Sequence, residues 1–310
     1  MHRSFTVRWR KAPPQMCEHP SPTLATMSTF PRPAWFSPTA YDSATTHELM
    51  SSGARISYRT GGSGSGPRFL FVHGGRAHST WWAAEVALFG ANTPKWAAMD
   101  LSGHGDSEWR DNYPASAWLG ELEAVASDLA RDDSLILVGH SLGGMLSLLL
   151  GARGTVPRIE HIVSVDAVPL DPAYASAQAE PSTSKPFYPT IAEGAEAFSS
   201  RSARAGWPSW LAEFVGERSL RPQDGGWVWR HDNSSRTIER PVLTELGALD
   251  LSRVTLVSGS RSPYAASLNA SGFVQMAGSA LTHVRLETGH DVMMEKPAEF
   301  HRTLMDAVGR

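Results

Sequence analysis

The sequence contains only one cysteine, Cys17, among its 310 residues. A single thiol excludes an intrachain disulfide and a cysteine metal cluster. Long apolar runs are missing as well, since none approaches the roughly 20 residues that a membrane-spanning helix requires. The net charge of −3 offers no electrostatic basis for binding nucleic acid or an anionic membrane. We therefore expect neither of these partners, and we expect no metal or cofactor.

The bulk composition is that of an ordinary soluble protein. Hydrophobic residues make up 41% and charged residues 19% of the chain, which suits one large α/β domain or two small ones. Prolines interrupt residues 1–40, so this stretch is predicted to be a flexible N-terminal tail. The tail is basic but has no secretory apolar core, and a cytoplasmic location is therefore expected.

The rest of the chain is organised around one strand-to-helix turn. Residues 135–138 are a run of branched apolar residues, which predicts a buried parallel strand. Gly-His-Ser-Leu-Gly follows at residues 139–143, and an apolar helical run comes next. The chain has to reverse direction around Ser141, and the two flanking glycines remove side chains that would collide across the bend. This pattern predicts a nucleophile elbow that presents the Ser141 hydroxyl over a helix N-terminus.

Strands and helices alternate along most of the chain. Strands are predicted at residues 48–50, 54–58, 68–72, 96–99, 135–138, 162–165, 254–257 and 282–286. Helices are predicted at residues 115–131, 145–150, 265–276 and from Pro297 onward. The alternation predicts an α/β core in residues 41–170 and 240–310, with a mostly parallel sheet and helices on both faces. A site in such a core lies at the carboxyl ends of the strands.

Residues 171–239 interrupt this alternation. They contain helical patches at residues 191–198 and 210–215 but no convincing strand, and four tryptophans fall among them: Trp207, Trp210, Trp227 and Trp229. An insert that leaves the carboxyl end of a strand beside the elbow is placed to cover the site. We predict that it forms a helical cap rather than a separate domain.

A serine becomes a good nucleophile only when a base takes its proton, and that base needs an orienting partner. His290 stands just past the last predicted strand, in Thr-Gly-His-Asp. That loop lies at the same edge of the sheet as the elbow, so the imidazole can reach Ser141. The pair predicts covalent catalysis, whereas the alternative is a glycine-rich turn with an idle serine.

Several ordered motifs resemble the α/β-hydrolase superfamily. They are His73-Gly74-Gly75, Asp100-x-x-Gly103-His104-Gly105-x-Ser107, the elbow around Ser141, and Gly289-His290. The resemblance covers residues 45–308. It implies an α/β-hydrolase fold with a cap inserted after the strand that follows the elbow helix, in the group of esterases and carbon–carbon hydrolases.

The orienting acid departs from the commonest pattern of that family. The acid most often follows the penultimate strand, but here no Asp or Glu occurs between Asp250 and Glu287. The other position used in the family is the end of the strand after the elbow helix, which is Asp166 in this chain. We expect an Asp166 oxygen to lie within about 3.2 Å of a ring nitrogen of His290. Its competitors in the cap are Asp171, Asp224 and Asp232.

The resemblance also implies the groups around the reacting carbonyl. The backbone N–H groups of Gly75 and Leu142 would form the oxyanion hole. The residues expected to bind substrate are Arg76, Trp82 and His140. Trp81 and Trp82 both follow the loop that carries Gly75, and they would share an apolar pocket with the cap tryptophans. Arg76 and Arg261 sit on loops at the rim, where each would hold a substrate carboxylate or remain a solvated surface charge.

These features predict a serine hydrolase that cleaves a small, largely apolar ester through Ser141, His290 and Asp166. Two alternatives stay open: cleavage of a carbon–carbon or amide bond in a carboxylate-bearing substrate, and a non-catalytic small-molecule receptor on the same fold. Epoxide and haloalkane hydrolysis are disfavoured, because the family members that perform them attack with Asp at the position of Ser141. The sequence does not predict the oligomeric state.

Overall fold

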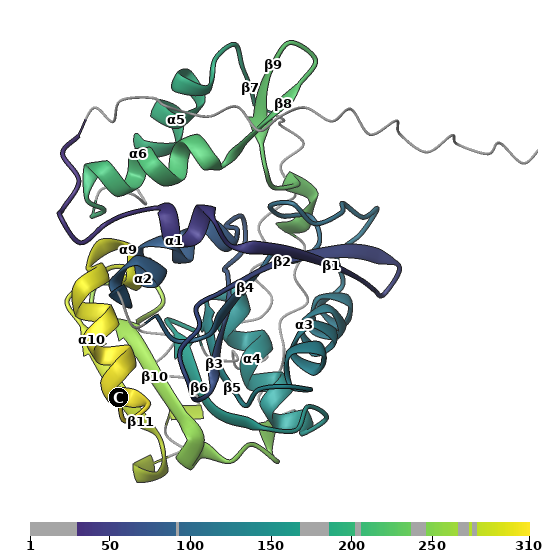
Figure 1. The fold of residues 1–310 in the computed structure, drawn as a ribbon, viewed down its shortest axis with the longest axis vertical. Coiled ribbons are helices and arrows are strands. Elements are labelled where there is room, and N and C mark those ends of the chain that lie inside the picture. Colours follow the sequence, from purple (N-terminus) through teal and green to yellow (C-terminus); the bar gives the residue numbers. More distant parts are fainter. Residues whose placement is uncertain are drawn as a thin grey trace, which may run out of the picture.

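The computed structural model describes residues 30–90, 93–167, 186–201, 206–236, 246–265, 273–274 and 278–310 (Figure 1). In this part of the chain an eight-stranded sheet runs in the order β1-β2-β4-β3-β5-β6-β10-β11. Its strands are β1 (Thr45–Ser51), β2 (Ala54–Gly61), β3 (Arg68–Val72), β4 (Trp96–Met99), β5 (Leu135–His140), β6 (Ile159–Val165), β10 (Val254–Gly259) and β11 (Thr282–Leu286). The pairings of β1 with β2 and of β2 with β4 are antiparallel, and the other pairings are parallel. The predicted, mostly parallel sheet is confirmed.

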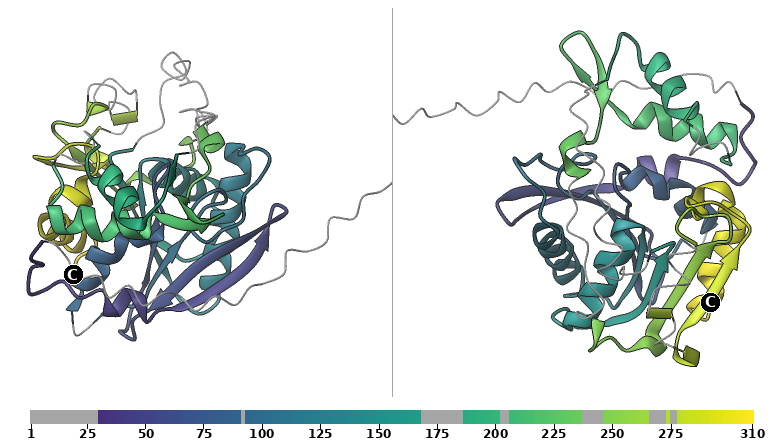
Figure 2. Two further views of the ribbon diagram at one scale, coloured as in Figure 1. Left: turned by 90° about the horizontal axis from the view of Figure 1, so that it is seen from above. Right: turned by 180° about the vertical axis from the view of Figure 1, so that it is seen from behind.

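Helices cover both faces of the sheet (Figures 1 and 2). They are α2 (Ala83–Leu88), α3 (Ala115–Leu129), α4 (Leu142–Arg153), α9 (Val292–Glu295) and α10 (Pro297–Ala307), with 3-10 turns η1 (Ser79–Trp82), η7 (Leu251–Arg253) and η8 (Gly278–Ala280). Successive strand residues alternate between the faces. Leu137 of β5 therefore joins one hydrophobic core with α3 and α4, while Val138 joins the other with α2 and α10. The two cores hold the carboxyl edge of the sheet in place.

The inserted segment lies above that edge in Figure 1. Its described residues form β7 (Phe187–Tyr188), α5 (Ile191–Ser199), α6 (Ser209–Arg218), β8 (Leu220–Gln223), β9 (Gly226–Trp229) and the 3-10 turn η5 (Asn233–Arg236). The three strands make a small sheet in the order β7-β9-β8. The expectation of a purely helical cap is therefore wrong. Asp224 and Gly225 join β8 to β9 with φ of 44° and 85°, the conformation of a tight hairpin turn.

The N-terminal segment begins its described structure before residue 40. Residues 30–38 lead into α1 (Thr39–Asp42). Phe36 is buried with its ring centroid 4.5 Å from that of Trp210 in α6, and the Tyr41 hydroxyl donates to Ser79 Oγ at 2.8 Å. The prediction of a flexible tail is thus wrong for residues 30–40, which join the cap to the core. Residues 1–29 lie outside the described residues, as does most of the helix predicted at 265–276.

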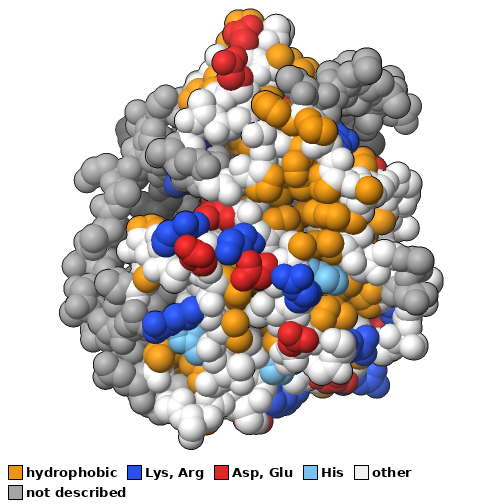
Figure 3. Space-filling view, turned by 90° about the vertical axis from the view of Figure 1, so that its left-hand side faces the viewer, with side chains coloured by type: hydrophobic (Ala, Val, Ile, Leu, Met, Phe, Trp, Pro, Cys, Tyr) orange, Lys and Arg blue, Asp and Glu red, His pale blue; other side chains and the backbone are white. Residues whose placement is uncertain are grey.

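One face of the molecule is divided between apolar and charged side chains. Figure 3 shows that hydrophobic side chains gather in its upper half and charged ones in its lower half. Phe30, at the beginning of the described N-terminal segment, is 43% exposed.

Among the described helices, none combines the length and apolar character needed to cross a bilayer.

Candidate active site

The predicted elbow is a strained turn between β5 and α4. Ser141 adopts φ 50° and ψ −114°, a conformation that L-residues rarely occupy, and its N–H donates to Val165 O at 2.9 Å. A Cβ on Gly139 would lie 2.3 Å from Gly143 O, and a Cβ on Gly143 would lie 2.4 Å from Val72 O. Both glycines are therefore required by close backbone approach, as the sequence predicted. The strain is of the kind that is stored at functional sites.

Asp166 and His290 form the predicted pair. Asp166 follows β6 directly, and its Oδ2 lies 2.6 Å from His290 Nδ1. The carboxylate also accepts hydrogen bonds from Gly259 N at 3.0 Å and from Ser262 Oγ at 2.5 Å, and its side chain is fully buried. The distance expected from the sequence is confirmed. Of the competing acids, Asp232 instead accepts from the Tyr113 hydroxyl, and Asp171 lies outside the described residues.

His290 is held beside the elbow by its neighbours. His140, the residue before Ser141, has a ring nitrogen, Nε2, 3.1 Å from the His290 carbonyl oxygen, and the two ring centroids are 4.7 Å apart. The ring of Tyr264 packs edge-on against His290 from the other direction, also at 4.7 Å. Since Nδ1 faces Asp166, Nε2 is the ring nitrogen that does not contact this carboxylate.

The predicted oxyanion residues lie on either side of the nucleophile. Leu142 is the first residue of α4, where backbone N–H groups point out of the helix. Gly75 follows Gly74, at which a Cβ would lie 3.2 Å from the Ser141 Cβ. The turn after Gly75 is fixed by Arg76, which has a φ of 63° and donates its N–H to His104 Nε2 at 3.0 Å.

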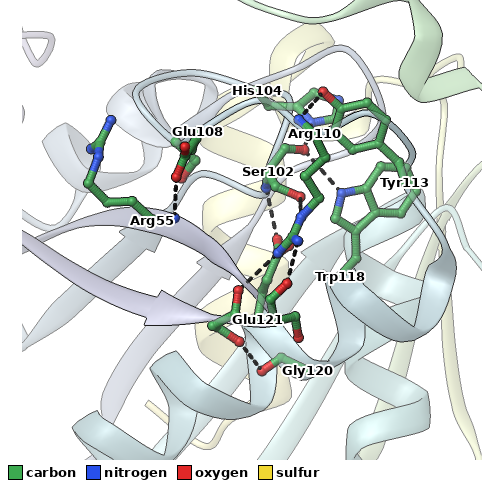
Figure 4. Close-up of polar contacts among 12 residues, drawn as sticks. Arg55, Ser102, His104, Glu108, Arg110, Tyr113, Trp118, Gly120 and Glu121 are labelled. Carbon is green, nitrogen blue, oxygen red and sulfur yellow. Dashed lines mark hydrogen bonds and ion pairs between the residues drawn. The ribbon is translucent and has the colours of Figure 1, made fainter. Parts of the chain in front are cut away.

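A buried network supports that turn from below (Figure 4). His104 Nδ1 lies 3.0 Å from Ser102 O, and the Ser102 N–H donates to Glu121 Oε2 at 2.8 Å. Arg110 donates to the Ser102 hydroxyl and to Glu121 Oε1, each at 2.8 Å. Burial lowers the pKa of His104 to about 3, so its ring stays neutral and Nε2 remains an acceptor for Arg76. The motif around His104 thus positions the turn after Gly75.

The two adjacent tryptophans expected at the pocket lie in different surroundings. Trp82 is fully buried, and its ring stacks on Phe71 beneath the sheet at 4.9 Å. Trp81 faces the site instead: its ring centroid lies 6.4 Å from that of His140 and 4.9 Å from that of Trp207 in the cap. The 3-10 turn Ser79–Trp82 sends the two adjacent side chains in different directions, which the sequence pattern does not reveal.

The two rim arginines differ in their surroundings. Arg261 donates to Glu287 O at 3.1 Å and lies 3.6 Å from Glu295 Oε2, so its charge is already matched and its assignment to a substrate carboxylate is not supported. The Arg76 side chain is exposed at the site loop. The expected contact of Arg76 with a substrate stays a prediction.

One trio of side chains has the spacing of metal ligands. A ligand atom from each of His140, His290 and Asp291 lies within 4.8 Å of the other two. Asp291 Oδ2 also accepts from Trp207 Nε1 at 3.2 Å. Because His290 belongs to the trio, an ion bound there would contact the imidazole that also contacts Asp166.

Comparison with known proteins agrees with this geometry. Residues 69–303 match the Alpha/beta hydrolase family. The chain belongs to this family. It is 29% identical over 273 residues to Esterase Rv0045c of Mycobacterium tuberculosis (strain ATCC 25618 / H37Rv), covering 81% of this chain and 85% of that protein. It is also 29% identical over 129 residues to Protein phosphatase methylesterase 1 of Bos taurus, but this match covers only 39% of the chain and 33% of that protein.

Solved structures show the same fold. The thioesterase domain from the curacin biosynthetic pathway superposes with a TM-score of 0.67 at 24% identity, covering 84% of this chain and 99% of that one. The structure of the M. tuberculosis esterase Rv0045c superposes with a TM-score of 0.69 at 22% identity, covering 86% and 92%. The α/β-hydrolase fold and the class of esterase-like hydrolases, both predicted from the sequence, are confirmed.

Proposed function

We propose that this chain is a serine hydrolase that cleaves a small, largely apolar carboxylic ester through an acyl-enzyme intermediate. The observation that carries the proposal is the 2.6 Å contact between Asp166 Oδ2 and His290 Nδ1 beside the strained turn at Ser141. This arrangement matches the nucleophile, base and orienting acid of a catalytic triad. The similarity to proteins named as esterases supports the choice of ester over other acyl compounds.

The reaction divides into two proton-balanced steps. Ser141 Oγ bonds to the ester carbonyl carbon while His290 Nε2 takes the hydroxyl proton, and the carbonyl oxygen becomes an oxyanion facing Gly75 and Leu142 N–H. Collapse breaks the carbon–alkoxide bond, and His290 returns the proton to the departing alcohol. Water then repeats the sequence on the acyl-enzyme and releases the acid. Asp166 stabilises the imidazolium in both steps.

The surroundings of the elbow favour an apolar acyl group. Trp81 packs against two cap residues, Trp207 at 4.9 Å and Phe198 at 6.3 Å between ring centroids. Such aromatic walls exclude water and bind hydrocarbon surface. A short or medium apolar acyl chain is the substrate portion that this wall would accept best.

A fluorophosphonate probe and p-nitrophenyl esters of graded chain length test the proposal together. Wild-type protein should be labelled rapidly, and Ser141→Ala should lose labelling and about 10⁴-fold or more in turnover while remaining folded. Ser200→Ala, which changes an exposed serine in the cap, is the matched control and should behave as wild type.

The outcomes separate the rival functions. Retention of turnover within about tenfold in Ser141→Ala would remove this serine from the mechanism. A wild-type protein that resists the probe would be a small-molecule receptor. A protein that is labelled but leaves every ester intact would point to amide or carbon–carbon bond cleavage, and Arg76 would then be tested as the group that binds a substrate carboxylate.

A further inference from the structure

A cavity between the cap and the core is lined by residues other than those of the proposed triad. Its volume is about 410 Å³, and its charged and aromatic lining comprises Arg55, Asp106, Glu108, Trp109, Arg221 and Arg230. Arg221 belongs to β8 and Arg230 follows β9, so both come from the β8–β9 hairpin of the cap. The other four come from β2 and from the loop after β4. Neither Ser141 nor His290 is part of this lining.

Arg221 lines the cavity without a direct ion-pair partner among the described residues, although the charge of Asp232 acts on it from nearby. Within the described residues its guanidinium makes no hydrogen bond or ion pair, and its Nε is buried without a partner. Its only ring contact is with Trp109, whose centroid lies 3.9 Å from the guanidinium carbon. Burial and then the neighbouring Arg230 lower the pKa of Arg221 below its usual value. An arginine carries five N–H donors, and burying them unsatisfied is unfavourable.

The acids of the cavity are already used by other groups. Asp106 accepts from Arg230 at 2.8 Å and from Arg59 at 3.3 Å. Glu108 accepts from the backbone N–H of Arg55 at 2.9 Å. Arg230 also retains a buried Nε without a partner among the described residues. Two guanidinium groups therefore line the cavity, and each has a buried Nε without an acceptor in the described part of the chain.

We propose that this cavity binds a small oxoanion, a phosphate or carboxylate group, between Arg221 and Arg230. The planar fork of a guanidinium matches the paired oxygens of both anions, and the bound charge would relieve the repulsion between the two arginines. The six lining groups leave space for more than the anion alone, so the ligand is a small molecule that carries such a group.

The site would connect the cap hairpin to the loop that supports the oxyanion turn. The Arg230 N–H donates to Ser219 O at 2.8 Å, which ties the arginine to the base of the hairpin. Across the cavity, Asp106 lies two residues past His104, the partner of the Arg76 N–H. A bound oxoanion would therefore bridge the cap and the core through Arg221 and Arg230 of the hairpin and the loop that carries Asp106.

Binding is tested on the full chain with inorganic phosphate and with malonate, using calorimetry and thermal unfolding at constant ionic strength. Either anion should raise Tm in a saturable way, because a ligand that binds only the folded state stabilises it. Arg221→Gln should weaken the affinity by about 10-fold to 100-fold, the range expected when a charged hydrogen-bonding partner is lost. Arg131→Gln removes an exposed arginine at another surface and should bind as wild type.

Each result decides the proposal. An Arg221-dependent response to phosphate alone, to malonate alone or to both supports the site and assigns the ligand to phosphorylated or carboxylated molecules. Arg221→Lys keeps the positive charge but loses the planar, two-pronged guanidinium. This variant replaces Arg221→Gln if the glutamine variant does not fold, and weakened anion binding by it supports the site equally. Equal shifts in wild type and the Arg221 variants, or no saturable shift, would overturn the proposal.

Discussion

At the scale of single residues, Asp166 is the proposed triad member whose position departs from the commonest pattern of the family. Its carboxylate accepts hydrogen bonds from Gly259 N and Ser262 Oγ as well as contacting His290. Asp166→Asn should leave a folded protein with kcat lowered by about 10²-fold to 10⁴-fold, because the amide presents the wrong group to the imidazole and removes the charge that stabilises imidazolium. Steady-state kinetics on the p-nitrophenyl esters measures this, with Asp224→Asn in the cap turn as control. An unchanged kcat would show that a group other than Asp166 orients the His290 imidazole.

The trio of His140, His290 and Asp291 leads to a prediction about metals. The proposed triad uses no metal, so EDTA should leave turnover unchanged. Added Zn²⁺ should inhibit, because imidazole and carboxylate are good zinc ligands and His290 is needed for proton transfer. Asp291→Asn should raise the zinc concentration needed for half inhibition by about tenfold or more, as loss of one ligand-shell group does. Loss of activity in EDTA would contradict the assignment.

The sequence predicts some site residues better than others for a physical reason. Ser141, Asp166 and His290 follow strand ends, and strand ends are readable from apolar runs. Trp81 and Trp82 stand side by side in a short 3-10 turn, so no periodicity tells which of them faces the site. The charge of Arg261 is matched by Glu295, which lies far along the chain from it and follows no sequence pattern.

At the scale of elements, the β8–β9 hairpin is the part of the fold that the sequence interpretation missed. Asp224-Gly225 is a strong signal for a two-residue hairpin turn. The flanking strands are four residues each and include Pro222, so the apolar alternation that identifies a strand is nearly absent. The long strands of the core, by contrast, are buried on both faces and stand out as continuous apolar runs.

The turn itself can be tested by adding one methyl group. Gly225 has a φ of 85° and nothing within 4 Å of its added Cβ, so Gly225→Ala introduces backbone strain without a clash. We expect a loss of about 1–2 kcal/mol in the free energy of unfolding, measured in urea. Gly247→Ala is the matched control, since its Cβ also meets nothing but its φ is not in the left-handed region. Equal stabilities of the two variants would show that the turn is not held as described.

At the scale of the whole molecule, four buried histidines lie where the cap meets the core: His73, His78, His104 and His231. Burial lowers the pKa of His73 to about 4 and that of His104 to about 3, and it holds the pKa of His78 and His231 well below the usual value. Below about pH 6.5 the unfolded chain therefore binds protons that the folded chain does not. Stability falls as pH falls when the unfolded state binds more protons.

We accordingly expect Tm to decrease between pH 7.5 and pH 5.5. The free energy of unfolding should fall by up to about 1.4 kcal/mol per pH unit for each histidine. Asp100 opposes this, because burial raises its pKa to about 6 and the folded state then keeps a proton that the unfolded state loses above about pH 4. Burial also raises the pKa of Glu85 and Glu121. These three carboxyls offset only part of the four histidines. Scanning calorimetry across this range is the measurement, and a Tm that rises on acidification would contradict the burial of these rings.

The overall architecture was predictable because strands and helices alternate with strong apolar patterns over most of the chain. The N-terminal segment was not, because its prolines suggest an irregular coil while Phe36 and Tyr41 pack against residues far away in the sequence. An irregular backbone is compatible with a buried position when a few aromatic side chains provide the contact area. The composition of such a segment describes its backbone and says little about its packing.

The hydrogen bond between Ser262 Oγ and Asp166 Oδ2 has an evolutionary consequence. Ser262 follows the penultimate strand, the place where most family members carry their acid, and its oxygen already lies 2.5 Å from the carboxylate that contacts His290. We expect a carboxylate at position 262 to reach the same imidazole, so that two substitutions would move the acid from one strand end to the other. The double variant Asp166→Asn with Ser262→Asp should therefore recover part of the kcat lost in Asp166→Asn. Such a recovery would show how the acid could change position between two branches of the family.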